Sequence, residues 1–178
     1  MPSGSRTMRC VYTREDIACR VRDIGAAVNA EYAGKDTVLI CVLKGAFMFF
    51  SDLLRELRFE PQIDFVRLAS YGDGMRTTRS ISFTKDVEIP LKDKHVLLVE
   101  DVIDSGRTMK FLLRRIKARR VASLKVAVLV DKTDQREVLI KPDFVGFNLA
   151  NGFIVGYGLD YAEQHRELPA LYEIASDV

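Results

Sequence analysis

Residues 96–109 read VLLVEDVIDSGRTM and form the most informative pattern in the chain. Four apolar residues, typical of a buried strand, lead into the adjacent carboxylates Glu100 and Asp101. A third acid, Asp104, opens the turn Ser105-Gly106-Arg107-Thr108, and apolar residues at helical spacing follow. We therefore expect a strand that ends in carboxylates and turns directly into a helix. The free amides at such a helix start attract phosphate.

Strand and helix patterns alternate along the rest of the chain. A helix capped by Thr13 is expected over residues 14–31, with its apolar stripe formed by Ile17, Val21, Ile24 and Val28. A second helix should bury one face, made of Phe47, Phe50, Leu54 and Leu57. Strands are expected over residues 37–43, 63–70, 80–83, 96–99, 125–130, 143–149 and 153–157. This order predicts one α/β domain over residues 1–178, with a mostly parallel central sheet flanked by helices.

Composition excludes several other classes of protein. The 178 residues carry a formal net charge of only +2, so a general nucleic-acid-binding surface is not expected. Two histidines and three cysteines without metal-ligand spacing argue against a zinc site and favour a reducing compartment. Cys41 lies in an apolar run and is interpreted as a core residue. With no apolar leader or membrane-length segment in the sequence, we expect a cytoplasmic protein without a membrane partner.

The acidic strand end can serve a phosphorylated sugar. Glu100 and Asp101 suit ribose hydroxyls and a magnesium ion, which prefers hard oxygen ligands. Asp104 lies closer to the turn and could handle a proton, while Gly106 would let the backbone approach a phosphate. The alternative is that Asp104 and Ser105 only cap the helix.

The run from Leu97 to Met109 resembles the signature of type I phosphoribosyltransferases, which use 5-phosphoribosyl 1-pyrophosphate. The resemblance implies the type I phosphoribosyltransferase fold, with a small hood subdomain beside the central sheet. It also implies that Asp104, Ser105, Gly106, Arg107 and Thr108 bind the 5-phosphate side of the substrate. Glu100 and Asp101 would then contact the ribose and Mg²⁺.

Two further segments resemble the hypoxanthine-guanine branch of that family. Leu43-Lys44-Gly45-Ala46 resembles the loop that binds pyrophosphate, often with a cis peptide before the lysine, which implies substrate binding by Lys44 and Gly45. Ser70-Tyr71-Gly72 resembles the start of the mobile catalytic loop, which implies substrate contacts from Ser70 and Tyr71. Residues 71–90 are accordingly expected to form a mobile active-site loop, and residues 1–12 a flexible N-terminal segment. Taken alone, Lys44 could instead reach solvent at a strand end, and Tyr71 could be a packing anchor.

The purine-binding part resembles the same branch. By resemblance, Lys132 contacts the 6-oxo group, Phe153 stacks on the ring and the Ile154 main chain reads its edge. Asp160 would lie near the base and a second Mg²⁺, and Arg166 would reach pyrophosphate. Taken alone, Phe153 would be assigned to the core and Arg166 to a solvated helix.

The resemblance covers residues 13–168 and weakens at 76–90 and 148–153. It implies a purine-salvage enzyme that transfers the 5-phosphoribosyl group to hypoxanthine and guanine, forming IMP or GMP and pyrophosphate. A homodimer or homotetramer is expected. Two alternatives stay open: a transferase of this fold that prefers xanthine or a pyrimidine, and a nucleotide-sensing RNA-binding regulator of the same fold.

Overall fold

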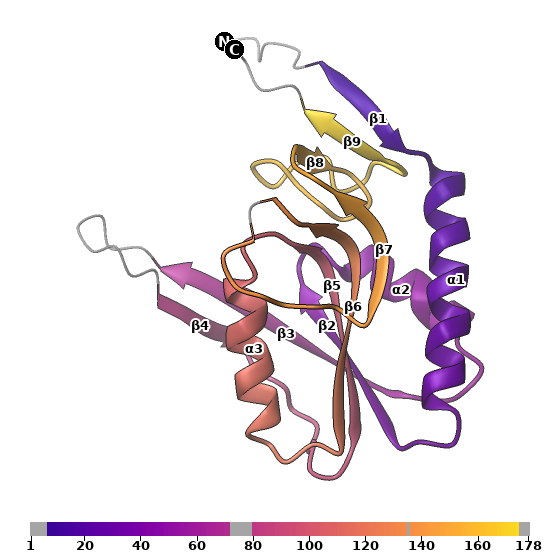
Figure 1. The fold of residues 1–178 in the computed structure, drawn as a ribbon, viewed down its shortest axis with the longest axis vertical. Helices are drawn as coiled ribbons and strands as arrows, with labels where there is room; N and C mark the ends of the chain where they lie inside the picture. Colours follow the sequence, from indigo (N-terminus) through magenta and orange to yellow (C-terminus); the bar gives the residue numbers. More distant parts are fainter. Residues whose placement is uncertain (1–6, 72–79, 135, 175–178) are drawn as a thin grey trace.

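The computed structural model describes residues 7–71, 80–134 and 136–174, which form two sheets and three helices (Figure 1). The central sheet has strand order β4-β3-β2-β5-β6-β7, and the small sheet has order β1-β9-β8. The central strands are β2 (Thr37–Leu43), β3 (Gln62–Tyr71), β4 (Ser80–Lys85), β5 (His95–Ile103), β6 (Ser123–Lys132) and β7 (Phe144–Leu149). The small sheet contains β1 (Met8–Tyr12), β8 (Phe153–Val155) and β9 (Leu171–Ile174). The helices are α1 (Arg14–Tyr32), α2 (Phe47–Glu56) and α3 (Arg107–Lys117).

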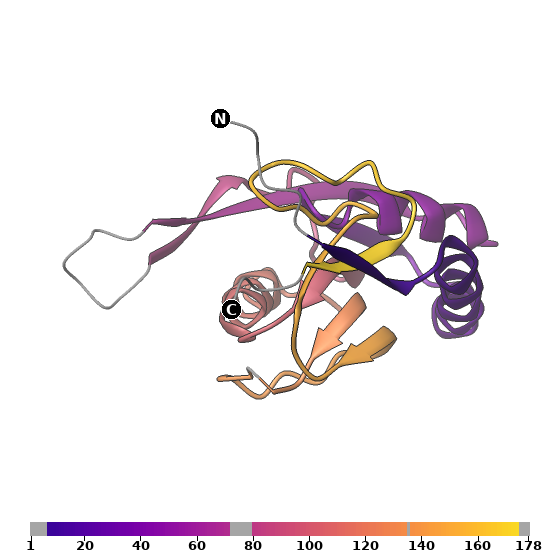
Figure 2. The same ribbon diagram turned by 90° about the horizontal axis from the view of Figure 1, so that it is seen from above.

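The central sheet is parallel except for its edge strand β4, which confirms the predicted fold class. Its inner strands are apolar on both faces because helices cover both faces. Helices α1 and α2 lie on one face and α3 on the other (Figures 1 and 2). Two apolar clusters result, one built around Val28 and Phe49 and the other around Leu112 and Ile116. Cys41, in β2, is buried as expected, and burial raises the pKa of its thiol to about 12.

The start of α1 follows its sequence pattern. Thr13 Oγ1 accepts a hydrogen bond from the Asp16 amide at 3.1 Å, and Asp16 Oδ2 accepts one from the Thr13 amide at 2.9 Å. These reciprocal bonds form a capping box, which satisfies amides that the first helical turn leaves free. The expected apolar stripe is buried throughout, at Ile17, Val21, Ile24 and Val28.

The predicted buried face of α2 is wrong at its start. Phe49, Phe50 and Leu53 face the core, whereas the Phe47 side chain is 39% exposed. The helix begins at Phe47, directly after the loop that ends β2, so this first residue lies at the rim of the sheet edge and not over the sheet.

The small sheet corrects two expectations about the chain ends. Met8–Tyr12, expected to be part of a flexible segment, form β1, because they pair antiparallel with β9 near the other end of the chain. Phe153–Val155 form β8, which pairs with β9 and so does not extend the central sheet. In Figure 1 this small sheet lies beside the carboxyl ends of the central strands, the position expected for the hood.

The polar segment after β3 is partly regular structure. Ser80–Lys85 pair antiparallel with β3, and the amides of Glu88 and Ile89 bond to Asp64 Oδ2 at 2.7 and 2.9 Å. The C-terminal part of the expected loop over residues 71–90 is therefore regular structure from Ser80 to Lys85. Residues 72–79 lie outside the described residues. No helix among the described residues is long and apolar enough to cross a membrane.

Candidate active site

The topological switch of the central sheet lies between β2 and β5. From β2 the chain passes through α2 to β3 on one side, and from β5 it passes through α3 to β6 on the other. Ligands of open α/β sheets bind at such a switch, beyond the carboxyl ends of the strands. Here the two strand ends touch: a Cβ at Gly45 would overlap the Asp101 carboxylate. The Leu43–Lys44 peptide bond is cis, as the resemblance implied.

A cavity of about 390 Å³ opens at this switch point. It brings together residues from the ends of β2, β3 and β5 and from the loop after β8. The predicted site residues in its wall are Lys44, Gly45, Glu100, Asp101, Thr108, Asp160 and Arg166. Seven predicted residues that are far apart in the sequence thus surround one space.

Two cations and two carboxylates form a network on one side of this cavity. Arg166 Nη2 lies 2.8 Å from Asp160 Oδ1 and 3.3 Å from Glu163 Oε2. Glu163 Oε2 also accepts a hydrogen bond from Lys44 Nζ at 2.8 Å. Contact with Lys44, and then with Arg166, lowers the pKa of Glu163, which keeps its carboxylate ionised at neutral pH. Lys44 and Arg166 therefore lie together and already face a negative group, as an anion site requires.

Glu100 and Asp101 lie across from this network. The Glu100 side chain is buried, and its pKa is raised well above the usual range by burial and by the neighbouring Asp101. Burial also raises the pKa of Asp101, against hydrogen bonds and the charge of Arg166, which lower it. Two neighbouring carboxyls, one buried and one partly buried, favour a proton or a cation between them.

The predicted metal residues do not form a ready-made site. In the ranges 7–71, 80–134 and 136–174, no three Asp, Glu, His or Cys side chains are placed to hold a metal ion. Glu100, Asp101 and Asp160 border the same cavity, but Asp160 is paired with Arg166. The Glu100–Asp101 pair still fits Mg²⁺, because the ion prefers hard oxygen ligands and often takes only one or two from the protein.

A second cavity, of about 120 Å³, adjoins the first along Glu100, Val102 and Thr108. It is lined by the turn from Asp104 to Gly106. Asp104 Oδ1 is buried without a hydrogen-bond partner among the described residues. A buried carboxylate oxygen without a partner is rare in folded proteins and is available to a ligand.

The turn is built for a close approach of backbone, since Gly106 has φ of +81°. Gly106 is the N-cap residue of α3, and no side chain caps this helix. The reading in which Asp104 caps the helix is therefore wrong. Ser105 Oγ accepts only a long bond of 3.4 Å from the Arg107 amide.

Arg107 departs from its predicted place. Its side chain is exposed and forms an ion pair with Glu137, and it lines neither cavity.

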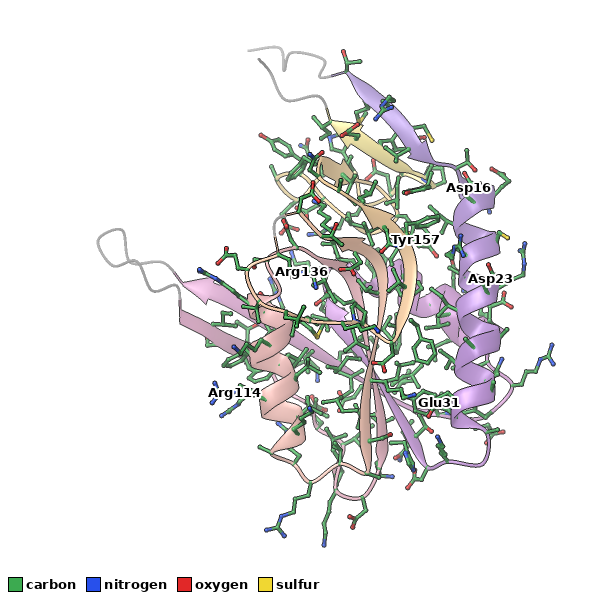
Figure 3. The ribbon with its side chains drawn as sticks, in the orientation of Figure 1. Asp16, Asp23, Glu31, Arg114, Arg136 and Tyr157 are labelled. Carbon is green, nitrogen blue, oxygen red and sulfur yellow. The ribbon has the colours of Figure 1, made fainter. Side chains whose placement is uncertain are left out.

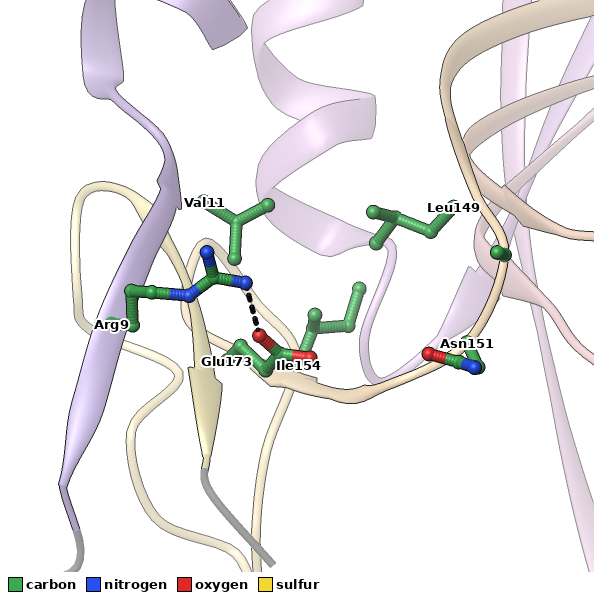
Figure 4. Close-up of a pocket in the computed structure, with 7 residues that line it drawn as sticks. Arg9, Val11, Leu149, Asn151, Ile154 and Glu173 are labelled. Atoms are coloured by element: carbon green, nitrogen blue, oxygen red, sulfur yellow. Dashed lines mark hydrogen bonds and ion pairs between the residues drawn. The ribbon is translucent and has the colours of Figure 1, made fainter.

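Of the predicted purine residues, Phe153 and Ile154 lie in strand β8 of the hood and Lys132 at the end of β6 in the central sheet. The Phe153 ring is 47% exposed, so the core reading is wrong, and it meets Tyr161 edge-on with centroids 5.5 Å apart. The Lys132 side chain is buried at the end of β6. Ile154 is buried and borders a separate cavity of about 210 Å³ beside the Arg9–Glu173 ion pair (Figure 4).

Ser70 and Tyr71 lie at the carboxyl end of β3, where their backbones pair with Ile81 and Ser80. Their side chains lie outside what the structure describes, so their predicted contacts stay predictions.

Sequence reasoning missed two charged residues. Glu163 joins Lys44 and Arg166, and only its spacing of three from Arg166 hinted at contact. Arg136 follows β6 in a polar loop, a context that predicts solvent exposure, yet its guanidinium is largely buried and bonds to several carbonyl groups.

Comparison with known proteins adds an independent finding. Residues 11–162 match the model of the phosphoribosyl transferase domain. Hypoxanthine phosphoribosyltransferase of Escherichia coli K12 is 38% identical over 170 residues, covering 94% of this chain and 96% of its own. Hypoxanthine-guanine phosphoribosyltransferase of Streptococcus agalactiae is 41% identical over 161 residues, covering 90% of this chain and 89% of its own.

The fold gives the same result. A crystal structure of hypoxanthine phosphoribosyltransferase from Staphylococcus aureus superposes with a TM-score of 0.89 at 35% identity, covering 94% of this chain and 91% of that one. The chain therefore has the type I phosphoribosyltransferase fold of these relatives. The chain belongs to the phosphoribosyl transferase domain family.

Proposed function

We propose that this protein transfers the 5-phosphoribosyl group from 5-phosphoribosyl 1-pyrophosphate to hypoxanthine and guanine. The observation that carries the proposal is the meeting of three groups at one switch point. These are the cations Lys44 and Arg166, the carboxyls Glu100 and Asp101, and the adjoining turn that starts at Asp104. A substrate with pyrophosphate, ribose hydroxyls and a 5-phosphate presents matching groups in that order.

The proposed reaction substitutes C1 of the ribose. A bond forms between N9 of the purine and C1, the bond from C1 to the pyrophosphate oxygen breaks, and a proton leaves N7 of the purine. Asp104 is proposed to accept that proton, because the residue lines the cavity at the phosphate turn and its Oδ1 has no hydrogen-bond partner among the described residues. Lys44 and Arg166 would stabilise the charge that develops on the departing pyrophosphate.

The turn from Asp104 to Thr108 is proposed to bind the 5-phosphate through backbone amides and the hydroxyls of Ser105 and Thr108. Arg107 would contribute through its main chain, since its side chain is paired with Glu137 and lines neither cavity. Anchoring the phosphate fixes the position of C1 relative to the base, which accounts for a large part of such rate enhancements.

Magnesium is the proposed cofactor. Glu100 and Asp101 would hold it on the ribose side, with Asp160 near a second ion, and substrate oxygens would complete each coordination shell. When bound, the ion would neutralise negative charge on the ribose diphosphate, and it would keep Glu100 and Asp101 ionised.

The proposed base site would give a preference for 6-oxo purines. The Lys132 ammonium can donate to a 6-oxo group but cannot accept from the amino group of adenine. Phe153 offers an exposed ring for stacking, and the Ile154 main chain lies beside it in β8. Ser70 and Tyr71, at the end of β3, are proposed to contact bound substrate.

A turnover assay tests this function. Purified protein with Mg²⁺ and 5-phosphoribosyl 1-pyrophosphate is given hypoxanthine, guanine, xanthine or adenine, and nucleotide formation is measured. The proposal expects IMP and GMP with little AMP, and loss of turnover when Mg²⁺ is chelated. Turnover with xanthine or adenine alone would change the assigned base, and turnover with none of the four would reject the function.

Assembly and location are proposed from the family alone. We propose a homodimer or homotetramer in the cytoplasm, acting on small molecules and not on nucleic acid. Light scattering of the protein as it elutes from a size-exclusion column gives its mass directly. A monomeric mass would reject the proposed homo-oligomer.

A further inference from the structure

We propose that Arg136 is a positioning residue that holds the phosphate turn and the base-side strand end in register. The inference rests on the proposed function and adds to it a residue that contacts no substrate. Arg136 belongs to the loop after β6, and Figure 3 labels it near the start of α3. It borders neither of the two substrate cavities.

The guanidinium joins the ends of β5 and β6. Nε donates to the Asp104 carbonyl at 2.9 Å, and Nη2 donates to the Lys132 carbonyl at 3.0 Å. Nη1 donates to the Ile140 carbonyl at 2.6 Å, and a weaker contact of 3.4 Å reaches the Ile103 carbonyl. The backbones of the proposed proton acceptor Asp104 and of the proposed base-reading Lys132 are thus bonded to one planar group.

Charge balance alone does not explain these contacts. The Arg136 side chain is 12% exposed and forms an ion pair with Asp131, which is also buried. One carboxylate neutralises the cation, yet the four carbonyl contacts come from both strand ends and from the loop itself. A guanidinium can serve so many acceptors because its five N–H donors have a fixed planar arrangement.

The same loop also supports the phosphate turn from outside. The Ser105 carbonyl accepts bonds from the amides of Glu137 and Val138, both at 3.0 Å. A Cβ added to Gly106 would lie 3.2 Å from Arg136 Cδ and 2.8 Å from the Val138 carbonyl oxygen. The turn therefore has no free space on this side, and a shift of Arg136 would move it.

These contacts predict that losing the guanidinium displaces the phosphate turn and the end of β6 together. Arg136→Lys keeps a cation for Asp131 but cannot reach all four carbonyls. The expected result is a rise of about 10-fold to 100-fold in KM for both 5-phosphoribosyl 1-pyrophosphate and hypoxanthine, the scale expected when substrates are misplaced by about 1 Å. The ratio of kcat/KM for hypoxanthine to that for adenine should fall, because Lys132 is no longer held in place.

Two controls separate positioning from general destabilisation. Arg114→Lys makes the same change on the exposed face of α3 and should leave every parameter unchanged. Asp131→Asn removes the ion pair but keeps the carbonyl contacts. It should lower Tm, because the buried guanidinium loses its carboxylate, while both KM values stay within about twofold of wild type. A purely structural arginine would reduce only the active fraction, and hence kcat, without altering KM or base selectivity.

Unchanged KM values and selectivity in folded Arg136→Lys would overturn the inference. If that variant does not fold, KM values that rise about tenfold in Asp131→Asn would overturn it instead, because the ion pair would then be the important contact. Should wild-type protein show no turnover, the proposed function fails separately. Calorimetric titration with ribose 5-phosphate then still compares the variants, with weaker binding expected for Arg136→Lys and equal binding contradicting the inference.

Discussion

The Lys44 ammonium lies 2.8 Å from Glu163 Oε2, in a cavity proposed to bind pyrophosphate. Both side chains are partly exposed, so the pair is worth little to folding. Its position matters more for ligand binding, because Glu163 is paired with Lys44, the cation that an incoming anion needs. Pyrophosphate must compete with Glu163 for Lys44 and also for Arg166.

Glu163→Gln should therefore tighten anion binding. Removing this negative charge frees Lys44 and Arg166, and we expect the KM for pyrophosphate in the reverse reaction to fall by about 1.5-fold to 5-fold at low salt, the range of exposed ion pairs. Glu167→Gln removes the same charge from a neighbouring exposed residue and is the matched control. A KM that rises in Glu163→Gln but not in the control would mean that Glu163 assists binding.

Asp104→Asn should separate chemistry from binding. Asp104 Oδ1 has no protein partner, so the amide costs no hydrogen bond within the described structure, but it cannot accept a proton. We expect kcat to fall by about 10²-fold to 10⁴-fold with a nearly unchanged KM for 5-phosphoribosyl 1-pyrophosphate. Asp93→Asn, at the opposite edge of the sheet before β5, is the control. Wild-type turnover in Asp104→Asn would remove Asp104 from the proton-transfer role.

Gly45→Ala should disturb the pair Glu100 and Asp101 without replacing either residue. The new Cβ would overlap the Asp101 carboxylate, which must move away from the strand end. We expect the Mg²⁺ concentration for half-maximal activity to rise at least about tenfold, and stability to fall by about 1–3 kcal/mol from overpacking. Titration of the activity with Mg²⁺ measures the first effect, and thermal unfolding measures the second.

Gly34→Ala is the control for that variant. Gly34 has φ of +73° and no atom within 4 Å of its added Cβ, so only backbone strain is expected, about 1–2 kcal/mol. Its Mg²⁺ dependence should equal that of wild type. If Gly45→Ala also keeps the wild-type Mg²⁺ dependence, Asp101 does not take part in metal binding.

Stability should depend on pH through Glu31. This carboxylate bonds to Lys125 and Lys35, both at 2.7 Å, and these contacts lower its pKa from 4.5 to about 2. A carboxyl with a depressed folded-state pKa contributes stability above its unfolded value, which is lost as pH falls through the folded value. The Tm difference between wild type and Glu31→Gln should be complete above about pH 5 and absent near pH 2. A difference that grows on acidification would contradict the assignment.

Local patterns predicted the central sheet because its strands are continuous apolar runs and its first helix carries a complete cap and stripe. They did not predict β1 and β9, which are short and pair across almost the whole chain, as the Arg9–Glu173 contact illustrates. Helix α2 was predicted at the right place in the chain, but a different face was expected to be buried. A ten-residue helix with several phenylalanines has more than one apolar face.

In the candidate site, too, local patterns identified some residues, while others are recognised only through contacts with distant parts of the chain. Glu100, Asp101 and Asp104 stand out because acids at the end of an apolar strand need partners. Glu163 and Arg136 do not stand out, since each occupies a polar loop and becomes important only through contacts with distant strands. The Arg107 side chain likewise pairs with Glu137, which is thirty residues away in the chain and could not be identified from the local pattern.

A crystal structure of the protein grown with IMP tests the central claim most directly. The account predicts the 5-phosphate within hydrogen-bond distance of the turn from Asp104 to Thr108, with the base beside Lys132 and against the Phe153 ring. Nucleotide bound elsewhere, for example in the groove lined by Tyr12 and Phe147, with only water in the turn, would contradict it.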